Sequence, residues 1–223
     1  MRIELTHPFI RGCRDYQALL KNCFKFSTFA NRVEKQALAK ATGGNGEIDT
    51  DIQNKYKGDA FELFVEAFVK VFGADILIGI DPQFYEVTDC EDDYGVDAIG
   101  KGLNGKVHTL QMKYRQAHWV LTTNGDHLSN FRSLSTMSVK SGGFGVDPDD
   151  KCQLRRRRIK NTCNMTIIHC GKEIHWEVKE KMLRDVREIN RKDIRQLVDD
   201  NGIFWDCFRE SWKAYKKSLK KKV

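Results

Sequence analysis

The sequence predicts a mixed α/β fold, in which a central β-sheet of mixed strand direction is flanked by helices. Three observations lead to this expectation: a helical apolar stripe over residues 58–72, a run of strand candidates over 75–115, and a further strand candidate at 164–169 followed by helical segments. The chain has 223 residues, of which 40% are hydrophobic, so it is long enough to bury a sizeable core.

Two helices are expected before the strands. Residues 14–41 are rich in Ala, Leu, Lys and Gln and contain no Pro, and a GGNG run at 43–46 then interrupts the pattern. The segment 58–72 is the clearest helix, because its apolar residues recur every three or four positions. These residues are Phe61, Phe64, Val65, Phe68 and Phe72, and Gly73 is a suitable terminator.

Four strand candidates follow, at residues 75–80, 84–88, 95–100 and 106–115. Asn104-Gly105 lies between the last two and predicts a hairpin with a type I′ turn, which needs positive φ at both central residues. The remaining expected elements are a helix at 126–139, a strand at 164–169, a helix at 175–185, a short strand at 186–189, and helices at 191–200 and 204–222.

These elements suggest three segments. Residues 1–57 form an N-terminal helical extension, residues 58–185 form the core domain, and residues 186–223 form a basic, helical C-terminal segment that packs on the core. The aromatic residues of the last segment are expected to dock its helix, although aromatics beside lysines also suit stacking on exposed bases.

The composition favours an intracellular protein with a polyanionic partner. Lys and Arg number 38 against 31 Asp and Glu, giving a net charge of +7, and such a surplus suits phosphate binding. Seven cysteines without a CxxC pair indicate reduced thiols. No signal peptide or membrane span is apparent, so we expect a soluble protein of the cytoplasm, the nucleoid or a viral replication site, without a membrane partner.

A cluster of Cys163, His169, Cys170 and His175 leaves a zinc site open as an alternative. Its spacing fits no standard zinc pattern, and we favour a strand that carries small apolar thiols.

One carboxylate stands inside an otherwise apolar strand candidate. Asp97 has Val96 on one side and Ala98 and Ile99 on the other. A buried lone carboxylate is costly unless it is paired or binds a metal. Asp97 is therefore the candidate for a central metal ligand.

The strand candidate 106–115 supplies the other members of the site. Residues two apart in a strand share a face, so Gln111 and Lys113 emerge together while Leu110 and Met112 face the opposite side. The expected hairpin places this strand beside Asp97. A carboxylate, an amide oxygen and an ammonium group then converge.

This set suits phosphodiester hydrolysis. A hard cation neutralises developing charge and acidifies water, and Mg²⁺ prefers a few oxygen ligands. We expect Asp97, the Gln111 side-chain oxygen and the Met112 backbone carbonyl to bind Mg²⁺, with Mn²⁺ as a substitute. Lys113 is expected to orient or help deprotonate the attacking water.

A fourth residue is expected from the helix at 58–72. With about 100° per residue, Glu62 falls at the rim of the apolar face and Glu66 falls further toward solvent. We therefore choose Glu62 as the assisting residue and further metal ligand, against the alternative of a solvated rim glutamate.

Together these residues resemble a known family. GDAFE at 58–62, GVD at 95–97 and QMK at 111–113 are similar, in this order, to motifs of the PD-(D/E)XK nuclease superfamily, and most to its Mrr-like restriction endonuclease branch. The resemblance covers residues 58–115 and extends loosely to 128–134 and 164–169. It implies a restriction-endonuclease-like sheet, Mg²⁺-dependent endonuclease activity on DNA, and 5′-phosphate products.

One residue departs from the wider superfamily, which usually has Asp or Glu where this chain has Gln111. Glutamine removes a negative charge and weakens metal affinity, although it is an accepted variant in the Mrr-like branch. The alternative is therefore a weakly active or inactive nuclease-fold module that binds nucleic acid. A third hypothesis is a structural protein in which Asp97 and Lys113 merely pair.

The expected partner is DNA, duplex or branched, with a second copy of the chain and a helicase as further candidates. We expect basic residues to contact the phosphate backbone. They are Arg115, Arg155, Arg156, Arg157, Arg158 and Lys160. A solvated loop is the alternative for the arginine run.

Overall fold

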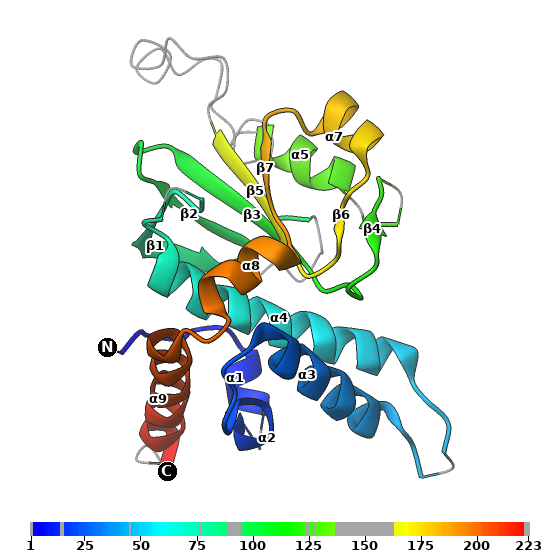
Figure 1. The fold of residues 1–223 in the computed structure, drawn as a ribbon, viewed down its shortest axis with the longest axis vertical. Coiled ribbons are helices and arrows are strands. Elements are labelled where there is room, and N and C mark those ends of the chain that lie inside the picture. The colour runs from blue at the N-terminus through cyan, green and yellow to red at the C-terminus, as the bar shows by residue number, and fades with distance from the viewer. Residues whose placement is uncertain are drawn as a thin grey trace. The chain divides into compact units, whose positions relative to one another are not determined.

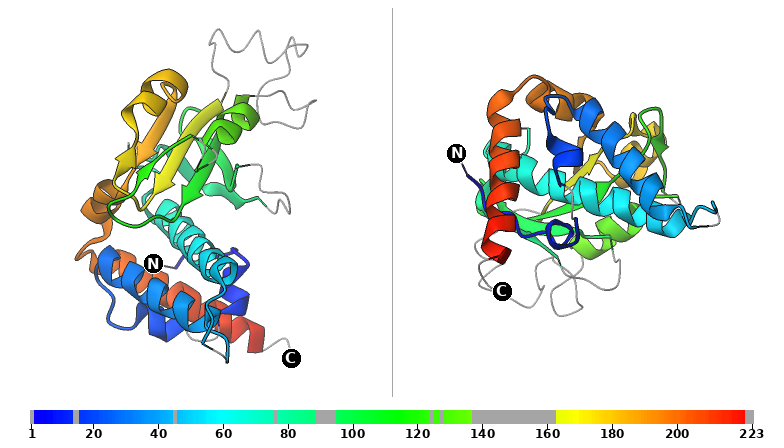
Figure 2. Two further views of the ribbon diagram at one scale, coloured as in Figure 1. Left: turned by 90° about the vertical axis from the view of Figure 1, so that its right-hand side faces the viewer. Right: turned by 90° about the horizontal axis from the view of Figure 1, so that it is seen from below.

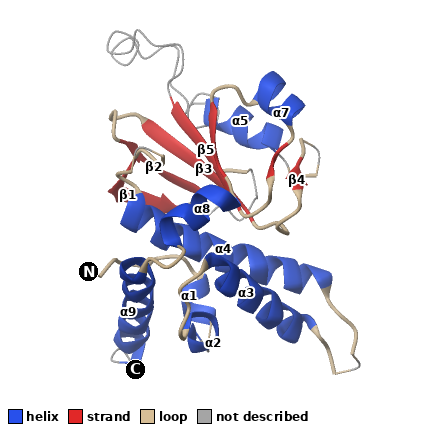
Figure 3. Cartoon of the chain, in the orientation of Figure 1, coloured by secondary structure: helices blue, strands red, loops and turns tan. Residues whose placement is uncertain are grey.

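The computed structural model describes residues 2–13, 16–44, 46–75, 77–88, 95–123, 125–126, 128–136 and 163–220 (Figure 1). The chain divides into two compact units, Met1–Val71 with Lys192–Val223, and Phe72–Arg191. This division differs from the three expected segments, because the helix at 58–72 groups mainly with the terminal segments. All the described strands lie in the second unit (Figure 3).

The first unit consists of helices α1 (Phe9–Gly12), α2 (Tyr16–Leu20), α3 (Phe26–Ala41) and α9 (Gly202–Lys220), most of α4 (Thr50–Phe72) and most of α8 (Arg191–Val198). Its core is aromatic, and α9 packs against α3 and α4 (Figure 2). The Phe29 and Phe64 ring centroids are 5.1 Å apart, and Trp205 is fully buried beside both. The expected docking of the C-terminal aromatics is therefore confirmed.

Helix α4 begins eight residues before the expected start. The Asp49 carboxylate accepts hydrogen bonds of 3.0 Å from the backbone N–H groups of Asp51 and Ile52. A side-chain oxygen before the first turn satisfies N–H groups that have no partner within the helix. This cap lies upstream of the apolar stripe, which is why the stripe alone places the start too late.

The second unit contains a five-stranded mixed sheet, made of β1 (Ile80–Val87), β2 (Ala98–Gly102), β3 (Val107–Lys113), β5 (Cys163–His169) and β7 (Val186–Ile189). The strand order is β1-β2-β3-β5-β7. The first three strands pair antiparallel, whereas β3–β5 and β5–β7 pair parallel. The mixed α/β class with a mixed sheet is confirmed, and β7, expected in the C-terminal segment, belongs to this sheet.

Helices α5 (Leu128–Thr136) and α7 (Trp176–Met182) lie near each other and cover part of the sheet (Figure 1). Phe131 of α5 packs in one apolar cluster with Met165 and Ile167 of β5, and Val178 of α7 packs against this cluster. Two short strands, β4 (Val120–Leu121) and β6 (Glu173–Ile174), form a separate parallel pair in the same unit. No described helix is long and apolar enough to cross a membrane.

The expected strand at 75–80 is wrong. This segment is a turn in which Asp75 accepts hydrogen bonds from the backbone of Leu77, Ile78 and Gly79, and Gly79 has a φ of 68°. The real strand runs through Pro82, which is tolerated because β1 is an edge strand with an irregular register between Asp81 and Glu86.

The hairpin between β2 and β3 is confirmed, but the type I′ turn is wrong. Lys101 pairs with Val107, and the Gly105 N–H donates to the Gly102 carbonyl at 2.8 Å. Gly105 has a φ of 76°, whereas Asn104 does not have positive φ. The connection is a three-residue loop that ends in a left-handed glycine, which is the second common way to close a hairpin.

Candidate active site

Asp97 is fixed between its two neighbouring strand segments, just before β2. Its backbone N–H donates to the Leu110 carbonyl at 2.9 Å, and its backbone carbonyl accepts from the Thr88 N–H at 3.1 Å. Its carboxylate accepts a short hydrogen bond from the Met112 N–H. The Asp97 carboxylate therefore lies against the backbone of β3, at the residue between Gln111 and Lys113.

Gln111 is the most unusual polar residue of this site. Its side chain is fully buried, and neither amide atom has a hydrogen-bond partner in the described part of the chain. A buried polar group without a partner is costly and rare. The amide rests against Gly95, where a Cβ atom would come within 3.1 Å of Nε2 and of the Phe131 backbone nitrogen. Because Gly95 also has a φ of 88°, glycine at this position of the GVD motif has a physical reason.

Lys113 lies two residues beyond Gln111, so both emerge on one face of β3. Its side chain is half-buried, and within the described ranges it makes no ion pair or hydrogen bond. Met112 points to the other face, where the Tyr85 hydroxyl contacts its sulfur at 4.0 Å. Gln111 and Lys113 thus share one face of β3, and the Asp97 carboxylate lies at the backbone between them.

The donor set fits a hard cation in part. An unsatisfied amide oxygen next to a fixed carboxylate suits Mg²⁺, which takes oxygen ligands and retains water. Among the described residues, no group of three or more His, Cys, Asp and Glu side chains is arranged to hold a metal ion. The Gln111 side-chain oxygen and the Met112 backbone carbonyl would be the further oxygen ligands beside Asp97.

Glu62 belongs to the first unit, where its carboxylate lies 2.9 Å from His7 Nε2 and its side chain is 26% exposed. The expectation that Glu66 faces solvent is wrong, because Glu66 is fully buried. Glu66 accepts hydrogen bonds from the Thr6 and His7 backbones and from Lys70 Nζ. The N-terminal segment covers this face of α4, which a helical projection of α4 alone does not reveal.

Arg115, expected to bind nucleic acid, forms a close ion pair with the fully buried Asp126 at 2.6 Å. Asp126 also accepts from the Thr122 N–H at 2.7 Å, so Arg115 holds the loop after β3 in place. The other expected phosphate contacts, at residues 155–158 and 160, lie outside the described residues.

Sequence reasoning missed a second polar pair on this side of the sheet. His169 is the register partner of Lys113 in the parallel β3–β5 ladder, and its Nε2 lies 3.0 Å from Glu188 of β7. Glu188 also accepts from the Ile174 N–H at 2.8 Å and from Lys179 at 2.7 Å. Burial alone would raise its pKa, but these hydrogen bonds outweigh it and lower the pKa of Glu188 to about 2.

The His169–Glu188 pair connects β5, β6, α7 and β7, so it holds the end of β5 beside Lys113. Only the parallel pairing reveals this neighbourhood, since 56 residues separate Lys113 from His169 in the chain.

No family model and no curated protein matches this chain.

Proposed function

We propose that the protein is a metal-dependent endonuclease that hydrolyses DNA phosphodiester bonds at Asp97, Gln111 and Lys113. The observation that carries the proposal is the fully buried amide of Gln111, which has no partner among the described residues, next to the Asp97 carboxylate that is hydrogen-bonded to the backbone of the same strand. Folding alone gives no reason to bury an unsatisfied amide, whereas a cation bound to its oxygen would offset the cost.

Each residue has a distinct role in this proposal. Asp97 and Gln111 would hold Mg²⁺ together with the Met112 carbonyl, and the ion would neutralise phosphate charge and acidify a water molecule. Lys113 orients the attacking water and offsets negative charge that develops on the phosphate. The assisting role of Glu62 stays a prediction, because Glu62 belongs to the first unit and the other three residues belong to the second.

DNA as the substrate is supported by the net charge of +7 and by the resemblance of the three motifs. A homodimer and an associated helicase remain part of the proposal as partners.

The test is Mg²⁺-dependent cleavage of a substrate panel: plasmid, linear duplex, flap, four-way junction and single strand. Asp97→Asn retains an acceptor for the Met112 N–H, so the fold is expected to survive while cleavage falls to background. Lys113→Met should lower kcat by about a hundredfold or more with little loss of DNA affinity, because it acts on the water. Lys172→Met is the matched control, because that side chain is 63% exposed and pairs only with the exposed Glu173 in the described structure.

Equal cleavage by the wild type and by Asp97→Asn would refute the assignment.

A second function is favoured by one observation: of the described side chains at this site, Asp97 alone carries a negative charge beside Gln111. A non-catalytic module that binds nucleic acid would show salt-sensitive DNA binding but no heat of Mg²⁺ or Mn²⁺ binding by calorimetry.

A further inference from the structure

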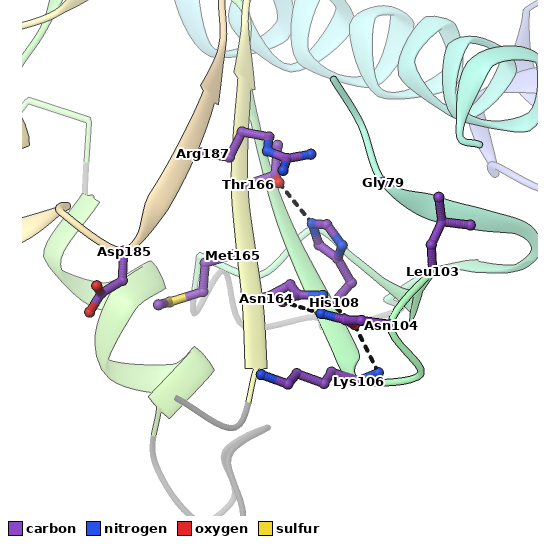
Figure 4. A pocket seen from close by; sticks show the side chains of 10 residues that line it. All are labelled: Gly79, Leu103, Asn104, Lys106, His108, Asn164, Met165, Thr166, Asp185 and Arg187. Carbon is purple, nitrogen blue, oxygen red and sulfur yellow. Dashed lines mark hydrogen bonds between the residues drawn. The ribbon is translucent and has the colours of Figure 1, made fainter. Parts of the chain in front are cut away.

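A second polar site lies at the other end of β3. A pocket of about 400 Å³ opens there, beside the β2–β3 hairpin (Figure 4). Five residues separate His108, which lines it, from Lys113, and at about 3.3 Å per residue the two are roughly 16 Å apart. They also project to opposite faces of the strand, so this pocket is distinct from the candidate active site.

The pocket contains a row of polar residues across three adjacent strands. His108 of β3 is the register partner of Asn164 on β5, and Thr166 on β5 is the partner of Arg187 on β7. Register partners project to one face of a sheet, so these four side chains share a surface. Met165, which follows Asn164 on β5, also lines the pocket and packs in the apolar cluster around α5.

His108 is the buried member of this row. Its side chain is almost fully buried, and Nε2 lies 2.7 Å from the Thr166 hydroxyl. The other nitrogen, Nδ1, has no hydrogen-bond partner in the described ranges. Burial lowers the pKa of His108 to about 4, reinforced by the charge of Arg187 and opposed by the nearby Gly79 backbone. The ring is therefore neutral near pH 7.

Two cations line the pocket, Arg187 at one end and Lys106 at the other (Figure 4). Arg187 Nη1 donates to the Leu77 carbonyl at 2.9 Å, which fixes the guanidinium group at the rim. Gly79 makes room for it, since a Cβ atom there would come within 3.1 Å of Nη1. Asp185 is the one carboxylate among the lining residues, so the lining carries a net positive charge.

Amide groups complete the lining. Asn104 and Asn164 donate to each other at 3.0 and 3.3 Å, and this pair closes the hairpin side of the pocket. Amides and a neutral imidazole hydrogen-bond a nucleobase, whereas lysine and arginine bind phosphate. The volume lies within the range of pockets that bind small ligands.

We propose that this pocket binds the phosphate monoester of a nucleotide, with Arg187 on the phosphate at one end and Lys106 with the asparagine pair toward the base at the other. The ligand is a free nucleoside monophosphate or the phosphorylated end of a strand, which share this chemistry. The proposal does not depend on the endonuclease assignment, because it uses other residues on another face of the sheet.

Calorimetry with the full chain in EDTA tests this, since chelation removes any contribution of Mg²⁺. The probes are deoxyadenosine monophosphate, deoxyadenosine, and a short oligonucleotide with and without a 5′-phosphate. We expect a Kd of about 1 mM or tighter for the monophosphate and binding at least about tenfold weaker for the nucleoside. Arg187→Met should weaken binding of the monophosphate by about tenfold or more, because it removes the charge that faces the phosphate, whereas Lys106→Met should weaken binding of the nucleoside and of the monophosphate alike. Arg184→Met is the matched control, because its side chain is 78% exposed.

A second measurement does not depend on any substitution. In the wild type, NMR titration of the His108 imidazole should show its pKa rising when the monophosphate binds, because a nearby anion favours the charged ring. Tighter binding of the 5′-phosphorylated oligonucleotide identifies a strand end as the ligand, and tighter binding of the monophosphate identifies the free nucleotide. Equal affinity for nucleoside and monophosphate, no binding up to about 10 mM, or unchanged affinity for the monophosphate in Arg187→Met overturns the proposal.

Discussion

Replacing Gln111 by Met should stabilise the second unit and abolish cleavage. The structure leaves both amide atoms of Gln111 buried without a hydrogen-bond partner in its described part. Methionine has the same unbranched length and carries no amide that requires a partner. If Gln111 is kept for metal binding, its removal should therefore help the fold while it harms function.

The size of the effect follows from the burial. A buried polar group left unsatisfied costs about 1–3 kcal/mol, so removing the amide should raise the free energy of unfolding by a similar amount. For a chain of this length, about 2–4 °C per kcal/mol gives a rise in Tm of roughly 2–12 °C. The gain is smaller where the methionine sulfur packs less well against Gly95 and Phe131.

Urea denaturation followed by circular dichroism measures the change, and hydrogen exchange of the β3 amides assigns it to the second unit. Gln116→Met is the matched control, because Gln116 is exposed just beyond β3 and should change stability by less than about 0.5 kcal/mol. Adding Mg²⁺ should stabilise the wild type more than Gln111→Met, since a ligand of the folded state raises its stability.

Two results would refute this reasoning. A destabilisation of more than about 1 kcal/mol in Gln111→Met would mean that the amide is satisfied in solution. Equal stabilisation of both proteins by Mg²⁺ would place any metal site away from Gln111.

Three further predictions concern buried ionisable groups. Glu66→Ala should lower the free energy of unfolding by about 3–5 kcal/mol, measured by urea denaturation, because it removes the carboxylate that pairs with Lys70 and accepts from the N-terminal backbone; Glu47→Ala, an exposed control, should not. The lowered pKa of Glu188 stabilises the fold above pH about 4.5 by at most about 3 kcal/mol, and this stabilisation is lost as pH falls toward 2. The urea midpoints of the wild type and of Glu188→Gln should therefore become equal near pH 2. His108 is a base whose lowered pKa means that the unfolded state binds its proton more readily than the folded state. The wild type should therefore lose up to about 3 kcal/mol of stability as pH falls from 6.5 to about 4, and His108→Gln should lack this slope. Parallel curves of stability against pH for the two proteins would contradict this prediction.

The sequence predicts most of the elements that carry the candidate site, because their patterns are local. The stripe over 58–72 and the strand that contains Gln111 and Lys113 have clear periodicity, and the hairpin signal correctly joins that strand to Asp97. Type I′ geometry fails because Gly105 alone supplies the positive φ that closes a three-residue loop. The apolar run at 75–80 fails as a strand because the Asp75 side chain and carbonyl organise a turn.

Non-local contacts account for the other differences. Burial of Glu66 depends on an N-terminal segment about 60 residues away in the chain, and the position of His169 beside Lys113 depends on parallel pairing. The residue pattern within one helix or one strand predicts neither the burial of Glu66 nor the position of His169. The pocket around His108 likewise needs three strands in register, so its residues appear scattered in the sequence.

Because β3 lies in the middle of the sheet, both of its faces carry side chains of a proposed site, and the position of each residue along the strand decides which face its side chain reaches. Odd-numbered Thr109, Gln111 and Lys113 serve one face, and even-numbered His108 serves the other. Inserting one residue after Lys106 would exchange the two sets between faces, whereas inserting two would restore each set to its own side. A longer insertion is therefore expected to be the milder one.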